Sequence, residues 1–174
     1  MKRINILATL ALMSAFLLAS CGDTEPVDPA VVTGNTNDEI IGRYRLTAFN
    51  TDVQTDLNND GNKSTNQMSE TACYNNMFLT LNEDNTFTAD SKGVGISATD
   101  ALQCSTAPIK SGTWVYTGGQ LLLTYAEGAG SITDSYTVSG DQISLRDDQA
   151  IIVGVPIDTP EFLSSGITKI YTKQ

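Results

Sequence analysis

Residues 112–125 read GTWVYTGGQLLLTY, and this stretch decides the fold class. Trp114 and Tyr116 are two residues apart, so they lie on one face of a strand predicted over residues 112–117. Two glycines follow, and a two-glycine turn joins antiparallel strands because glycine readily adopts positive φ angles. Residues 120–125 then supply a returning strand. The stretch therefore predicts a β-hairpin.

Predicted strands and turns continue on both sides of this hairpin. Short turns at residues 83–85 and 140–141 join two further pairs, and no segment has a helical period of useful length. Strands at this spacing predict an all-β fold, either a sandwich or an antiparallel eight-stranded up-and-down barrel. We expect the barrel, because closure removes edge strands that would otherwise pair with other chains. Nine segments carry a strand pattern, which is close to the number that such a barrel needs: residues 40–49, 77–81, 86–89, 112–117, 120–125, 131–139, 142–146, 150–155 and 167–172.

The alternating pattern also predicts which side chains face the barrel interior. In the first strand these are Tyr44, Leu46 and Ala48. The other inward positions are Leu79, Leu81, Phe87, Trp114, Tyr116, Leu121, Leu123, Tyr136, Val138, Ile143 and Leu145. An eight-stranded barrel holds either side chains or one small ligand. A cavity for a small apolar ligand would be lined by Tyr44, Leu46, Leu79, Phe87, Trp114, Tyr116, Leu123 and Tyr136, and the alternative is that these side chains fill the barrel.

Several stretches resemble the lipocalin-like domains of small bacterial lipoproteins. Residues 41–46 are similar to the opening strand, which begins Gly-x-Trp in that family, although Tyr44 stands in the place of the tryptophan. Residues 79–88 and segments of residues 112–145 are similar to the later strands. The resemblance spans residues 39–172. It implies an eight-stranded antiparallel barrel, a ligand of unknown identity and no catalytic residues.

The composition excludes several classes of function. The 174-residue chain carries 10 basic and 20 acidic side chains, so we expect no nucleic-acid binding, which requires a basic surface. The chain contains no histidine. The commonest general base and the usual zinc and copper ligand are therefore missing. No pair of carboxylates stands out for acid–base catalysis, and the sequence predicts that the protein is not an enzyme.

The first 21 residues predict an export signal and a lipid anchor. Lys2 and Arg3 precede an apolar run, residues 6–18, that is shorter than the ~20 residues a membrane-spanning helix needs. Small residues and then Cys21 follow, and this order resembles the lipobox of bacterial lipoproteins. The resemblance implies cleavage before Cys21 and acylation of its thiol with fatty acids such as palmitate. A transmembrane anchor and an ordinary signal peptide are the alternatives.

A tether is predicted between the anchor and the barrel. Residues 22–38 contain two prolines and several acidic side chains without a helical or strand period, which is typical of an extended linker. The predicted organisation is a signal peptide in residues 1–20, a lipidated tether in 21–38 and a lipocalin-like barrel in 39–174. This organisation predicts an outer-membrane lipoprotein of the Gram-negative cell envelope, periplasmic or surface-exposed. Asp23, Glu25 and Asp28 resemble a surface-export signal, and a merely solvated linker is the alternative.

Cys73 and Cys104 remain for a disulfide once Cys21 carries lipid. Export places both cysteines in a compartment that permits disulfides. A bridge would close a loop of about 30 residues and contribute roughly 3–4 kcal/mol by the chain-entropy estimate. Two reduced, buried thiols are the alternative.

A polar loop after the first predicted strand has the spacing of a calcium site. Residues 56–61 read DLNNDG, which matches the first half of an EF-hand loop, with Gly61 at the sharp turn. The predicted ligands are Asp56, Asn58, Asp60, Asn62 through its carbonyl, and Glu70. Gln67 stands where that motif places a bidentate glutamate, so the use of Glu70 requires a longer loop. An Asx-turn loop without metal is the alternative.

Together these features predict a monomeric, non-catalytic binding module held to a membrane through Cys21. Its expected ligand is a small apolar molecule, and its expected cofactor is a structural calcium ion. The alternative is a filled barrel that works through its loops on an envelope protein. An open interior would favour the first interpretation, and a packed interior would favour the second.

Overall fold

The computed structural model describes residues 37–157 and 159–174. The predicted signal peptide, the lipid attachment at Cys21 and the tether through residue 36 lie outside these residues. Residues 37 and 38, at the end of the predicted tether, belong to α1 (Asn37–Ile40), a single helical turn. No helix in the described ranges is both long and apolar enough to cross a membrane.

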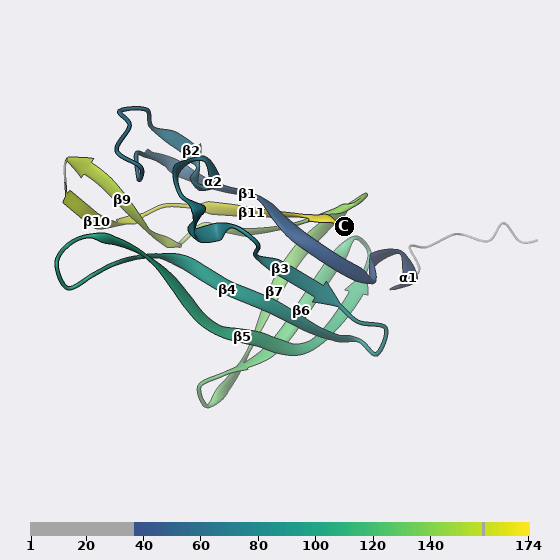
Figure 1. Ribbon diagram of the computed structural model, residues 1–174. Helices are drawn as coiled ribbons and strands as arrows, with labels where there is room; N and C mark the ends of the chain where they lie inside the picture. The colour runs from purple at the N-terminus through teal and green to yellow at the C-terminus, as the bar shows by residue number, and fades with distance from the viewer. Residues whose placement is uncertain (1–36, 158) are drawn as a thin grey trace, which may run out of the picture. The chain divides into compact units, whose positions relative to one another are not determined.

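Eight strands form a closed antiparallel barrel (Figure 1). They are β1 (Gly42–Thr55), β3 (Phe78–Leu81), β4 (Thr86–Ile96), β5 (Leu102–Thr117), β6 (Gln120–Glu127), β7 (Gly130–Ser139), β8 (Gln142–Asp147) and β11 (Ile167–Lys173). Each strand pairs with the next one in this order. β11 pairs with β1 and closes the barrel, with Tyr171 opposite Leu46. The predicted eight-stranded antiparallel barrel is therefore confirmed.

The β5–β6 hairpin requires glycine at its turn and within β5, for different reasons. Gly118 and Gly119 have φ angles of 58° and 83°, which is the geometry of a tight two-residue hairpin turn, as the sequence predicts. Gly112 lies where β5 first meets β6, opposite Tyr125. A Cβ at Gly112 would collide with the backbone carbonyl of Thr124, so the close approach of the two strands depends on the missing side chain.

The prediction that residues 150–155 form a barrel strand is wrong. These residues belong to β9 (Ile151–Ile157), which pairs with β10 (Thr159–Ser164) in a separate two-stranded sheet. The other eight strands already close the barrel, so no position is left for another. The β9–β10 hairpin follows β8 and contacts β1 and β4 beyond the body of the barrel (Figure 1).

The two ends of the barrel carry different connections. At the closed end lie α1, the C-terminus and the short turns that follow β3, β5 and β7 (Figure 1). At the open end lie the β9–β10 hairpin, the tip of the β4–β5 hairpin and the long connection from β1 to β3. That connection contains β2 (Ser64–Asn66), α2 (Gln67–Glu70) and the 3-10 helix η1 (Ala72–Tyr74). β4 and β5 run well past the predicted strands, and their paired extension projects at the open end.

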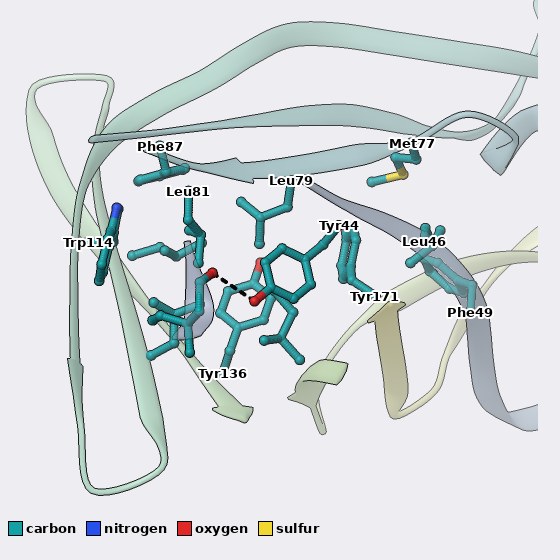
Figure 2. Close-up of a cluster of buried hydrophobic side chains, with 14 of the residues drawn as sticks. Tyr44, Leu46, Phe49, Met77, Leu79, Leu81, Phe87, Trp114, Tyr136 and Tyr171 are labelled. Carbon is teal, nitrogen blue, oxygen red and sulfur yellow. Dashed lines mark hydrogen bonds between the residues drawn. The ribbon is translucent and has the colours of Figure 1, made fainter. Parts of the chain in front are cut away.

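Buried apolar side chains fill the barrel near the closed end (Figure 2), and the same cluster continues to Phe49, Tyr74, Ile152 and Ile167 at the open end. The Tyr44 hydroxyl donates to the Ile40 carbonyl at 2.7 Å and ties α1 over this end. The Trp114 indole Nε1 donates to the Asn82 carbonyl at 3.1 Å, so its polar atom has a partner. Most of the predicted inward side chains are buried, and Val138 and Leu145 are half-buried against the same cluster.

The prediction that Ala48 shares the inner face with Tyr44 and Leu46 is wrong. The register between β1 and β11 shifts between Leu46 and Ala48. Such a bulge adds one residue to the strand, so the side chains beyond it reverse their direction. Phe49 is therefore buried in the core and Ala48 is only half-buried.

Candidate functional site

The predicted ligand-cavity residues lie in a packed core. All eight side chains are buried, namely Tyr44, Leu46, Leu79, Phe87, Trp114, Tyr116, Leu123 and Tyr136. Of these eight, only Tyr136 borders a cavity described below, and that cavity is the smaller one. Side chains therefore fill the interior near the closed end, which is the arrangement that the second interpretation of the sequence expects.

The interior becomes polar toward the open end. A small cavity of about 70 Å³ lies there, bordered by Asp90, Lys110, Asp134 and Lys169 among others. Lys110 Nζ donates to the Tyr125 hydroxyl at 2.6 Å, and that hydroxyl donates to Asp134 Oδ2 at 3.1 Å. Burial raises the pKa of Tyr125, so the phenol stays protonated at neutral pH and can donate. These side chains form a polar layer above the apolar core, in which the Tyr125 hydroxyl links Lys110 to Asp134.

A larger groove lies beyond this polar layer, between β4 and the β9–β10 hairpin. Its volume is about 460 Å³, which falls in the range of small-molecule sites. We call it the open-end groove. Its lining combines apolar side chains with three charged ones and comes from Phe49, Tyr74, Lys92, Gly93, Val94, Asp147, Ala150, Ile151, Ile152, Val153, Phe162, Ile167 and Lys169.

Apolar side chains form both the base and the outer wall of the open-end groove. The rings of Phe49 and Tyr74 stack with their centroids 4.4 Å apart. Burial raises the pKa of Tyr74 to about 12, so its ring is neutral at physiological pH. Ile151 and Phe162 are 70% and 66% exposed, which is unusual for large apolar side chains on neighbouring strands. The groove therefore offers an apolar surface that solvent can reach.

Lys169 borders both the polar layer and the groove. Its Nζ lies 5.4 Å from the centroid of the Phe49 ring. Burial lowers the pKa of Lys169, the neighbouring charge of Lys110 lowers it further, and Asp134 and Asp147 oppose the shift. Within residues 37–157 and 159–174, Lys169 Nζ has neither a hydrogen bond nor an ion pair. Lys169 is thus a half-buried cation without an anionic partner.

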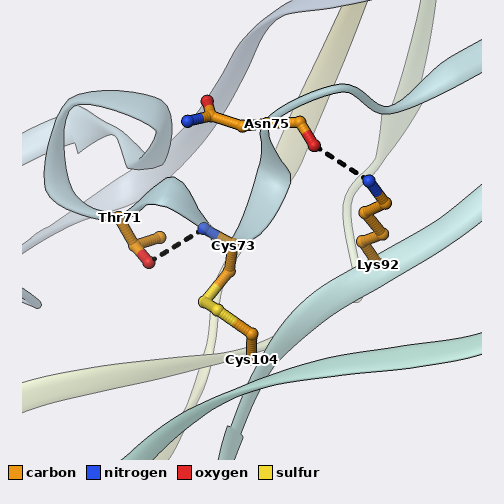
Figure 3. The surroundings of a disulfide bond; sticks show 5 residues. All are labelled: Thr71, Cys73, Asn75, Lys92 and Cys104. Atoms are coloured by element: carbon orange, nitrogen blue, oxygen red, sulfur yellow. Dashed lines mark hydrogen bonds between the residues drawn. A yellow bond between two sulfur atoms is a disulfide. The ribbon is translucent and has the colours of Figure 1, made fainter.

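The predicted disulfide between Cys73 and Cys104 is confirmed and braces one wall of the groove (Figure 3). It joins η1 to β5. Lys92 Nζ donates to the carbonyls of Asn75 and Asn76, both at 2.9 Å, and so joins the same region to β4. Since Tyr74, Lys92 and Val94 line the groove, these links hold the projecting β4–β5 hairpin against its base.

The predicted calcium loop is a compact turn at the open end. Asp56 accepts the N–H groups of Asp60 at 3.1 Å and Gly61 at 2.8 Å, and Asn58 Oδ1 also accepts from Asp60 N at 3.0 Å. The Asn62 N–H donates to Asp60 Oδ1 at 2.7 Å.

Glu70 is buried beside this loop, where its Oε2 accepts from Leu57 N at 3.1 Å. Its carboxylate therefore supports the loop backbone. Among the described residues, no three His, Cys, Asp or Glu side chains are grouped as a metal site. The structure thus gathers Asp56, Asn58 and Asp60 and directs Glu70 to a backbone partner.

The closed barrel and its groove define a fold typical of binding proteins rather than enzymes. The family model described as a lipocalin-like domain matches residues 40–145, and the chain belongs to this family. The match ends within β8, so the β9–β10 hairpin that walls the groove lies beyond it. Searches of curated proteins and of solved structures each found no match.

The sequence contains an indication of the polar layer that the strand pattern alone did not reveal, namely charged residues at inward positions. Lys169 falls at an inward position of β11, between Ile167 and Tyr171. Lys110 also lies at an inward position, on the same strand as Trp114, and Asp134 lies at an inward position on the same strand as Tyr136. Charged residues at inward positions of a barrel strand need a partner or water, and this requirement indicates a polar site.

Proposed function

We propose that this protein is a lipid-anchored binding module of the Gram-negative cell envelope that holds a small ligand in the open-end groove. The contrast between the two ends of the barrel carries this proposal. The interior near the closed end is filled, whereas the groove of about 460 Å³ presents the exposed side chains of Ile151 and Phe162. The ligand site is therefore beside the barrel interior rather than deep within it.

Anchoring through Cys21 is compatible with this site. Asn37, the first described residue, begins α1 at the closed end of the barrel, and neither it nor any other residue of α1 lines the groove. The basic start, the short apolar run and Cys21 support acylation, and each buried CH₂ of an acyl chain contributes ~0.8 kcal/mol to membrane binding. Two or more acyl chains would hold the protein firmly on the membrane.

The proposal includes a structural calcium ion in the loop of residues 56–62. The alternate spacing of Asp56, Asn58 and Asp60 supports it, together with the short contacts that gather these side chains. The ion would brace the connection from β1 to β3, which stands beside the groove. Its role would be structural, since the loop contributes nothing to the lining of the groove.

A second candidate function is recognition of an envelope protein through the loops of the open end. The exposure of Val53, Ile151 and Phe162 favours it, because all three apolar side chains lie on elements at this end. A protein partner would cover these side chains without entering the groove.

Two measurements test the proposed function. Radioactive palmitate should label the wild-type protein, and it should not label a Cys21→Ala variant. The groove is tested with the neutral fluorescent probe phenylnaphthylamine. The protein used is the mature chain with Cys21→Ala, which carries no acyl groups and is exported behind an ordinary cleavable signal peptide. We expect saturable binding of one probe that Ile151→Ser weakens and Val115→Ser, at a barrel-surface position 59% exposed, does not. No saturable binding would overturn the small-ligand proposal and favour the protein partner.

A further inference from the structure

We propose that the open-end groove binds a small amphiphile with an apolar body and a single anionic group, and that the anionic group pairs with Lys169. This inference rests on the proposed function, because it names the ligand class of the same groove. Three observations support it: the apolar side chains of the lining, the absence of an anionic partner for Lys169 and the distribution of the other charges.

The lining of the groove fits an apolar body. Phe49 and Tyr74 form a stacked aromatic base, and Ile151 and Phe162 provide an exposed aliphatic and aromatic wall. Covering this surface removes apolar area from water on both the protein and the ligand, which favours binding in proportion to the area. A wholly polar ligand would leave these side chains without that gain.

Lys169 supplies the requirement for an anion. Its ammonium group is half-buried, lies over the Phe49 ring and has no hydrogen bond or ion pair to any described residue. A desolvated charge without a partner is costly, and an anionic group in the groove would restore the lost interaction as a charge-assisted hydrogen bond. The burial that lowers the pKa of Lys169 is consistent with this picture.

The other charges near the groove already have partners. Lys110 donates to Tyr125, Lys92 donates to two backbone carbonyls, and the exposed Asp147 carboxylate accepts the Gln149 N–H at 2.9 Å. The lining carries two cations, Lys92 and Lys169, against one anion, Asp147, so its net charge is positive and disfavours a cationic ligand. Acidic side chains elsewhere on the surface act on an anion at longer range, and physiological salt screens that effect beyond about 8 Å.

A matched pair of fluorescent probes tests the proposal on the mature chain described above. Anilinonaphthalene sulfonate and phenylnaphthylamine share one aromatic skeleton, and only the first carries an anionic sulfonate. We expect the wild-type chain to bind the sulfonate about tenfold more tightly than the neutral probe, because charge-assisted hydrogen bonds strengthen binding by roughly this factor.

The Lys169→Met variant should abolish this preference. It keeps the length and apolar character of the side chain and removes the charge, so binding of the sulfonate should weaken about tenfold while the neutral probe binds as before. Lys169→Arg should retain the preference. Lys63→Met, at an exposed lysine outside the groove, should change neither affinity. Unchanged binding of the neutral probe shows at the same time that Lys169→Met still folds.

The same experiment distinguishes failure of the anionic ligand class from failure of the proposed binding function. Equal affinity of the wild-type chain for both probes, or full sulfonate binding by Lys169→Met, would overturn the assignment of an anionic ligand and leave the binding module standing. Failure of both probes to bind would overturn the ligand class and the proposed function together.

Discussion

The closed and open ends of the barrel use the same alternating strands but have opposite interiors. At the closed end, inward positions carry Trp114 and Phe87, each 1% exposed. At the open end, the same inward phase carries Lys110, Asp134 and Lys169, which are half-buried around a polar cavity. The strand period determines which way each side chain points, and the residue type determines whether the space is filled or kept polar.

This difference divides stability and function between the two ends. Packing at the closed end removes large apolar side chains from water and supplies most of the hydrophobic stabilisation. The open end instead keeps a groove that is braced by a disulfide and walled by a hairpin outside the barrel. Changes at the closed end should therefore unfold the protein, whereas changes at the open end should mainly alter binding.

The largest effect is expected from Trp114→Ala. This substitution leaves a cavity in the closed-end core and should lower the free energy of unfolding by about 3–5 kcal/mol. Val115→Ala, at the neighbouring exposed position, should change it by less than about 0.5 kcal/mol. Urea unfolding followed by far-UV circular dichroism measures both values. Similar losses in the two variants would show that the closed end is not the packed core described here.

The double variant Cys73→Ser, Cys104→Ser tests the brace at the open end. The bridge closes a loop with a sequence separation of 31 residues. Its removal should lower the free energy of unfolding by roughly 3–4 kcal/mol by the chain-entropy estimate.

The same double variant should also bind phenylnaphthylamine more weakly, because the β4–β5 hairpin is no longer held against η1. The probe affinity is measured under conditions where the variant remains folded by circular dichroism. An unchanged affinity would mean that the disulfide stabilises the chain without shaping the groove.

Calcium should stabilise the connection from β1 to β3. At about 10 mM calcium and a Kd of about 10⁻⁴–10⁻³ M, binding to the folded state adds roughly 1–3 kcal/mol. Thermal unfolding with calcium and with magnesium measures this increment. Asp56→Asn should abolish the increment, whereas Glu83→Ala, in an exposed turn of the closed end, should leave it intact. An increment that survives Asp56→Asn would place the ion elsewhere.

Alkaline pH should lower the stability of both ends. Burial raises the pKa of Tyr44, at the closed end, and of Tyr74, at the open end, to about 12 each. The unfolded chain releases these protons near its ordinary pKa of about 10, so the stability present below pH ~10 falls as pH rises toward ~12.

Tyr44→Phe should make this alkaline loss shallower. It should also lower the free energy of unfolding at neutral pH by about 1 kcal/mol, because the hydrogen bond to the Ile40 carbonyl is lost. Urea unfolding at a series of pH values between neutrality and the alkaline limit follows both effects. An equally steep alkaline loss in the variant would show that Tyr44 ionises normally in the folded protein.

Local patterns predicted most of the barrel because its strands are short, sequential and joined by tight turns. The alternation around Trp114 and the turn at Gly118 and Gly119 indicated a hairpin that the structure contains. The pairing of Cys73 with Cys104 followed from counting the cysteines that the predicted lipid attachment at Cys21 leaves. Each of these inferences depends on residues that are close in sequence or few in number.

The remainder depends on contacts that no local pattern contains. The bulge after Leu46 reversed the direction of Ala48 and Phe49, and a strict period of two cannot show an added residue. The strand at residues 151–157 carries the pattern of a barrel strand, yet closure by β11 excludes it from the barrel. The groove joins residues between Phe49 and Lys169, so only the fold brings them together.

The most direct test of the account observes both ends of the barrel in one titration. Trp114 is the only tryptophan of the chain, so its indole N–H resonance reports on the closed end without ambiguity. The backbone amides of Gly93 and Phe162 report on the groove. During titration with phenylnaphthylamine, we expect saturable NMR shifts at Gly93 and Phe162 and a stationary Trp114 indole signal. A larger shift at Trp114 than at the groove amides would show that the ligand enters the closed-end interior, and it would contradict the account.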